Sequence, residues 1–173
     1  MLRLNLILTI SFWTIATHGQ SIKEFYRLCN TIPLNSKFNS KTTPLPYEYD
    51  KYSYGKTYRL NCEKVKTLYN VPIEKVLIHV VENDTVNAIR IYLPFDSTLH
   101  KRIEAELGRS ETAWMAFPLG KLDTAGIIWD RRWFIDDYIV WFRCTRYINL
   151  LGEPGDDKIL IVLMPHYRKE HQN

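Results

Sequence analysis

The segment WDRRWFIDDYIVWF (residues 129–142) has an alternating pattern that predicts how part of the chain folds. Apolar runs flank the pair Asp136-Asp137, and such a pair is typical of a tight turn, so the segment is predicted to be a β-hairpin. Pairing outward from that turn places Arg132 opposite Trp141. Because successive side chains of a strand point to opposite faces, the alternation predicts one apolar core face and a second face that mixes charges with aromatic rings.

Five residues of the second face form a candidate binding surface. Asp130 and Arg143 are predicted to make a cross-strand ion pair, and Arg132 is predicted to lie over the ring of Trp141 as a cation–π contact. Phe134 adds an apolar ring near the turn. Flat rings beside oriented polar groups are typical of a surface that binds a partner.

Two alternatives to this surface stay open. The N-terminal third of the chain would cover the aromatic face if this face belongs to the interior, since exposed apolar patches are uncommon on monomers. A turn at Asp130-Arg131 would exchange the residues of the two faces. Adjacent carboxylates at a hairpin tip do not converge on one substrate atom, so Asp136 and Asp137 are predicted to be turn residues and not a catalytic pair.

Residues 73–165 carry the clearest patterns and are predicted to form a β-β-α-β-β-β body. VLIHVVENDTVNAIRIYL (76–93) is predicted to be a hairpin with a two-residue loop at Asn83-Asp84. DSTLHKRIEAELG (96–108) has apolar residues at helical spacing and ends in glycine, so it is predicted to be a helix. KILIVLMP (158–165) is apolar on both faces, which is typical of a central strand. This order predicts the α+β class: a single antiparallel sheet made of a hairpin, a helix and then a three-strand meander.

The N-terminal part of the expected domain, residues 20–72, is predicted to be an irregular wrap rich in tyrosine and proline, with short helices. SIKEFYRLCN (21–30) begins with a capping box and continues with apolar residues at helical spacing. LNCEKVKTLYNVP (60–72) is predicted to be a second short helix capped by Asn61. Residues 20–173 are therefore expected to form one α+β domain, with 166–173 as its tail.

Residues 1–19, MLRLNLILTISFWTIATHG, have the pattern of a secretory signal peptide. Arg3 precedes an apolar run, and Thr17 and Gly19 are small residues at the expected cleavage site. The alternative is a membrane anchor, but the run is shorter than the ~20 apolar residues that a spanning helix needs. No cysteine directly follows the run, which argues against a lipid anchor. The sequence therefore predicts a secreted or periplasmic protein without a stable membrane span after cleavage.

Three cysteines, Cys29, Cys62 and Cys144, bear on the redox state of the expected mature chain. In an oxidising compartment one pair can form a disulfide, and Cys29 with Cys62 is the candidate pair. Cys144 lies on the apolar face of the predicted hairpin and is expected to be a buried thiol. The spacings match no zinc pattern, so no metal site is predicted.

Charge and motifs exclude several classes of function. The net charge is +4, and basic and acidic residues are well mixed along the chain. The sequence therefore lacks the clustered positive charge of a nucleic-acid interface. No nucleophile-elbow, zinc-protease, phosphate-loop or dinucleotide motif is present. No catalytic residue and no cofactor are therefore predicted.

The sequence favours a secreted or periplasmic, non-enzymatic binding domain that uses the second face of the 129–142 hairpin. In its order of elements the chain resembles small α+β modules of bacterial cell envelopes, which implies a protein or another envelope component as partner. A small secreted hydrolase, whose site forms only in three dimensions, is one alternative. Binding of a glycan or an apolar ligand through the aromatic residues is another. A deep pocket that joins a histidine to a carboxylate would favour the hydrolase.

Overall fold

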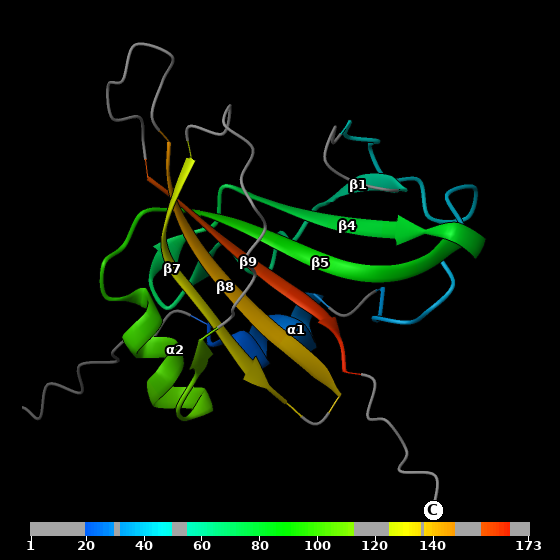
Figure 1. The fold of residues 1–173 in the computed structure, drawn as a ribbon. Helices are drawn as coiled ribbons and strands as arrows, with labels where there is room; N and C mark the ends of the chain where they lie inside the picture. The colour runs from blue at the N-terminus through cyan, green and yellow to red at the C-terminus, as the bar shows by residue number, and fades with distance from the viewer. Residues whose placement is uncertain are drawn as a thin grey trace, which may run out of the picture.

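The computed structural model describes residues 20–29, 32–49, 55–112, 125–135, 137–147 and 157–166. A large antiparallel sheet and two α-helices dominate this part of the chain, which confirms the α+β class (Figure 1). The expected signal peptide, the turn residue Asp136 and the tail beyond His166 lie outside the described residues.

Seven strands form the large sheet within the described residues, in the spatial order β1-β4-β5-β9-β8-β7-β6. Every neighbouring pair is antiparallel. Strand β9 lies between β5 and β8, as the apolar character of both its faces predicts. The strands are β1 (Lys56–Leu60), β4 (Lys75–Val81), β5 (Thr85–Pro94), β6 (Glu111–Thr112), β7 (Ala125–Phe134), β8 (Tyr138–Tyr147) and β9 (Lys158–Pro165).

Both helices contribute to a single core on one face of the sheet. Helix α1 (Ile22–Cys29) buries Ile22 and Phe25 completely, and helix α2 (Leu99–Leu107) buries Leu99 and Ile103. Figure 1 shows α1 behind strands β8 and β9. The sheet side chains of the same core are those that alternate toward the helices, including Ile78, Ile89, Ile91, Val140, Phe142, Ile159, Ile161 and Leu163.

The helix ends follow the local signals of the sequence. The Ser21 hydroxyl accepts a hydrogen bond of 3.2 Å from the backbone N–H of Glu24, so Ser21 caps the start of α1. Helix α2 ends at Gly108, whose φ of 84° favours glycine and whose N–H donates to the carbonyl of Glu104.

The predicted helix over residues 60–72 is wrong. The chain forms a two-stranded sheet of β2 (Thr67–Leu68) and β3 (Val71–Pro72) there, separate from the large sheet. Tyr69 and Asn70 form the turn with φ values of 49° and 67°, the left-handed region that a tight hairpin needs. Leu68 and Val71 join the core, so burial of these two side chains outweighs the helical spacing.

The irregular wrap also contains a strand that the sequence pattern did not reveal. Strand β1 pairs with β4 and buries Tyr58 and Leu60 on the core side. Gly55 precedes β1 with a φ of 121°, and a Cβ at this position would lie 2.4 Å from the carbonyl oxygen of Val80. The close approach of the two backbones therefore depends on glycine.

The loop between β4 and β5 differs from the predicted two-residue turn. Glu82–Asp84 form one turn of 3-10 helix, and Val81 pairs with Thr85. A register shift then pairs Val80 with Val86, and not with Asn87 as predicted. The irregularity turns Val86 toward the core face, where this side chain is fully buried. The burial of Val86 stabilises the irregular register.

Candidate functional site

The second face of the β7–β8 pair holds four polar and aromatic side chains, which we call the Trp141 cluster: Asp130, Arg132, Trp141 and Arg143. Asp130 pairs with Arg143, and Arg132 pairs with Trp141, so the register predicted outward from the hairpin turn is correct here. Farther from the turn a register shift pairs Thr145 with Ile127, not with Ile128 as strict alternation predicts.

Asp130 is the central acceptor of the cluster. Its Oδ1 accepts a hydrogen bond from Nε1 of Trp141, and its Oδ2 accepts one of 2.9 Å from Nη2 of Arg143. The side chain of Asp130 is 10% exposed and that of Arg143 is 21% exposed, so the ion pair is partly shielded from water. Both oxygens of the carboxylate are therefore occupied.

Two guanidinium groups lie over the indole of Trp141. The centre of the Arg143 guanidinium is 4.3 Å from the ring centroid, and that of Arg132 is 5.4 Å away. Both distances lie within the range of a cation–π contact. The expected contact between Arg132 and Trp141 is present, and Arg143 provides a second one that the cross-strand pairing alone did not predict.

Three nitrogen atoms of the cluster lack an acceptor. Nε and Nη2 of Arg132 and Nε of Arg143 are buried, and none has a hydrogen-bond partner among the described residues. A buried N–H of a charged group without an acceptor is costly, so such atoms are rare unless water or a bound group satisfies them. These three donors are the strongest sign of a ligand on this face.

Apolar side chains border the cluster toward the centre of the sheet. On β9, Leu160 pairs with Arg143, Val162 with Trp141 and Met164 with Ile139. Val162 is 5% exposed. The face thus continues from the guanidinium groups onto an apolar strip.

Phe134 lies apart from the Trp141 cluster, at the end of β7 next to the turn. Its side chain is 47% exposed and contacts the ring of His166, with a centroid distance of 5.4 Å. Helix α1 packs on the opposite face of the sheet, so this helix does not cover the cluster. Phe134 is the exposed aromatic ring closest to the cluster along the strand.

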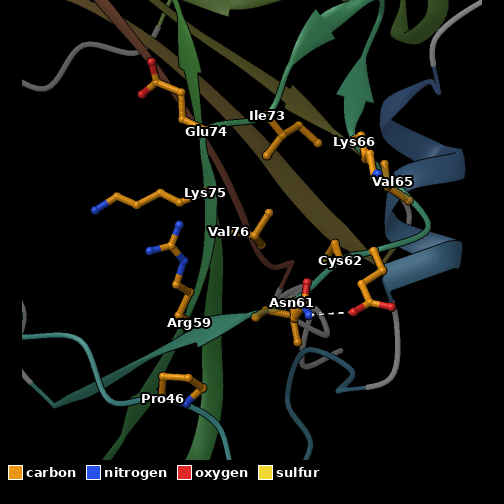
Figure 2. A pocket seen from close by; sticks show the side chains of 12 residues that line it. Pro46, Arg59, Asn61, Cys62, Val65, Lys66, Ile73, Glu74, Lys75 and Val76 are labelled. Carbon is orange, nitrogen blue, oxygen red and sulfur yellow. Dashed lines mark hydrogen bonds between the residues drawn. The ribbon is translucent and has the colours of Figure 1, made fainter.

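A groove of about 540 Å³ lies at a different place, around the start of β4 (Figure 2). Figure 2 shows Arg59 and Lys75 on one side of β4, with Cys62 and Val76 on the other. Lys75 bonds to Glu48 at 2.5 Å, so its charge is already paired. The groove is lined by Pro46, Arg59, Leu60, Asn61, Cys62, Glu63, Val65, Lys66, Ile73, Glu74, Lys75 and Val76.

The groove lining does not combine a histidine with a carboxylate, the arrangement that would favour a hydrolase. Glu74 is paired with Lys158 at 2.8 Å, and Glu63 accepts a hydrogen bond of 3.0 Å from Asn61. Across the part of the chain that the structure describes, no group of three or more acidic, histidine or cysteine side chains could hold a metal ion.

A second polar cluster, which the sequence pattern missed, connects the helices to the small hairpin. The Tyr69 hydroxyl donates to Oε2 of Glu106 and accepts a hydrogen bond from the N–H of Ile22. Burial raises the pKa of Tyr69 well above its ordinary value, and the bond to Glu106 raises it further. Burial, together with the charge of Glu106, raises the pKa of Tyr138 to about 12. This arrangement joins α1, α2 and the β2–β3 turn, which is a structural role.

The structure describes the side chains of two of the three cysteines. Cys144 is fully buried on the core face of β8, as predicted. Cys62 is half-buried and packs against the core beside the groove. The side chain of Cys29 lies outside the described residues, so its pairing with Cys62 stays a prediction.

Comparison with protein families, curated proteins and solved structures finds no match for this chain. Neither of the two described helices has the length and apolar content of a membrane-spanning segment.

Proposed function

We propose that the chain is a secreted or periplasmic, non-enzymatic binding domain whose ligand or partner contacts the Trp141 cluster and Phe134. The observation that carries this proposal is the set of three buried guanidinium N–H donors without an acceptor, beside the half-buried indole of Trp141. A partner from the cell envelope would supply the missing acceptors and cover the apolar strip of β9.

The chemistry of the cluster favours binding over catalysis. A guanidinium stays protonated in proteins, so Arg132 and Arg143 cannot exchange a proton with a substrate. Asp130 already accepts two hydrogen bonds, which leaves it poorly placed to act as a general base. The cluster can bind and orient an anionic group of a partner, which is the role of a recognition site.

Secretion is the second part of the proposal, and the pattern of residues 1–19 supports it. We expect cleavage after Gly19. Intact-mass measurement of the protein recovered from the medium or periplasm would then give a chain that begins at Gln20, whereas retention of Met1 in the membrane fraction would contradict secretion.

The binding role is tested by truncating the indole with Trp141→Ala and measuring both thermal unfolding and capture of a partner from a cell-envelope extract. We expect the variant to stay folded and to lose capture, since the ring contributes more to a contact than to the core. Tyr49→Ala is the matched control, because Tyr49 is an aromatic residue with 78% exposure outside the site. Capture that is lost equally in the control, or retained in Trp141→Ala, would contradict the proposed function.

A further inference from the structure

We infer that the Trp141 cluster recognises a carboxylate attached to an apolar group. This inference rests on the proposed binding function and names the chemical class of its ligand. Three features of the cluster support it: the donors that lack acceptors, the charge of the cluster and the side chains around it.

The two atoms of Arg132 that lack acceptors form one edge of its guanidinium group. Nε–H and an N–H of Nη2 point in the same direction, as two parallel donors in a rigid plane. That spacing fits the two oxygens of a carboxylate, which accepts both bonds at once. Two adjacent N–H donors without acceptors therefore indicate a bidentate acceptor, which a single N–H without an acceptor would not.

No acid of the described part of the chain occupies this edge. Both oxygens of Asp130 bond to other members of the cluster. Glu111 lies directly opposite Arg132 on β6, but its side chain is exposed and makes no ion pair with Arg132 among the described residues. This edge therefore has no acceptor among the described side chains, and in the inferred complex the ligand supplies it.

The charges of the cluster fit a ligand with one negative charge. Arg132 and Arg143 carry two positive charges, and Asp130 neutralises one of them. The charge of Glu111 opposite Arg132 is exposed and therefore screened by solvent. A single carboxylate balances the remainder, and Nε of Arg143 is a third buried donor of the cluster without an acceptor. Because the donors are shielded from water, each charge-assisted bond would be stronger than on an open surface.

The surroundings of the cluster indicate what the carboxylate is attached to. The indole of Trp141 lies beside the guanidinium groups, and the partly exposed side chains of Leu160 and Met164 lie on the same face of β9. If the carboxylate were attached to a polar or multiply charged group, that group would lose its hydration over this strip without gaining hydrogen-bond partners. An alkyl chain, or the apolar side chain next to a peptide's C-terminal carboxylate, would bury its surface there.

The inference is tested by following the side-chain Nε–H resonance of Arg132 by NMR while hexanoate is added to the full mature chain. We expect a saturable shift of this resonance. Hexanamide, which has the same tail without the charge, and inorganic phosphate, which has charge without a tail, should each bind at least about tenfold more weakly. No shift with hexanoate, or an equal response to phosphate, would overturn the inference.

Arg132→Lys keeps the charge and removes the bidentate edge. We expect this variant to bind hexanoate at least about tenfold more weakly, since a hydrogen bond to a charged group contributes roughly that factor. Arg59→Lys is the matched control: Arg59 lies on the same face of the sheet, on the far edge strand β1, and should bind as the wild type does. Equal affinity of Arg132→Lys and wild type would overturn the inference, and the wild-type titration decides it if Arg132→Lys does not fold.

Two peptide probes identify the source of the carboxylate. A short apolar peptide with a free C-terminus that binds more tightly than hexanoate, while its C-terminal amide does not bind, would support a chain end as the ligand. Tighter binding of hexanoate would support a free organic acid. If hexanoate and both peptides fail while Trp141→Ala still loses partner capture, the carboxylate inference is wrong and the proposed binding function stands.

Discussion

Trp133 and Trp141 lie on neighbouring strands and point to opposite faces of the sheet. Trp133 is 2% exposed, and its Nε1 donates a hydrogen bond of 2.9 Å to the carbonyl of Gly108 at the end of α2. The indole of Trp141 is half-buried and donates to Asp130. One hairpin thus presents a tryptophan to the core and another to the candidate site, because its side chains alternate.

We expect Trp133→Ala to reduce the free energy of unfolding by about 3–5 kcal/mol, as deletion of a buried aromatic ring usually does. Trp141→Ala should cost roughly half as much, because its ring buries less area. Urea unfolding of both variants and the wild type measures the difference. Equal losses would mean that Trp141 belongs to the interior, as the alternative of a covered face requires.

Two glycines with positive φ provide a matched pair of backbone tests. Gly108→Ala should cost about 1–3 kcal/mol, because alanine is strained at a φ of 84° although no other atom lies near the new Cβ. Gly55→Ala should cost more, since its Cβ would also lie 2.4 Å from the carbonyl oxygen of Val80. Urea unfolding of the two variants checks the order, and a smaller loss at Gly55 would contradict the close packing of that segment against β4.

The raised pKa of Tyr138 predicts a loss of stability at alkaline pH. Its phenol titrates near 10 when the chain is unfolded and at about 12 in the folded state. The unfolded chain therefore releases this proton first as the pH rises, and the stability that is present below pH ~10 falls until the folded phenol also ionises. Tyr138→Phe should show a shallower decline over this range.

The measurement for Tyr138 is the free energy of unfolding at a series of pH values between roughly 8 and 12, for the wild type and for Tyr138→Phe. All other groups of the chain contribute to both curves, so the difference between the two curves measures the effect of the Tyr138 phenol. Parallel curves would contradict the burial of this phenol.

The cysteines predict a specific pattern of thiol labelling in protein recovered under oxidising conditions. Cys144 is fully buried and should react only after unfolding. Peptide mapping without reduction should recover Cys29 linked to Cys62. A bridge that includes Cys144, or fast labelling of Cys144 in the native protein, would contradict this pattern.

The sequence determined the β7–β8 hairpin and the pairing of Asp130 with Arg143 and of Arg132 with Trp141. The reason is local: two alternating strands joined by a short turn have a single register that keeps their apolar residues on one face. The start of α1 and the end of α2 were likewise predictable, because a serine cap and a terminal glycine act within a few residues of the helix.

The local pattern did not determine the structure of residues 60–72. Their apolar spacing predicts a helix, but the chain forms a hairpin there. There the tertiary structure decided, since burial of Leu68 and Val71 in a core built from distant segments outweighs a short periodicity. The pairing of β1 with β4 and the packing of α1 on the core face also depend on contacts between distant parts of the chain. The orphaned edge of Arg132 is visible only in three dimensions, because the sequence shows which residue types are present but not which hydrogen bonds they lack.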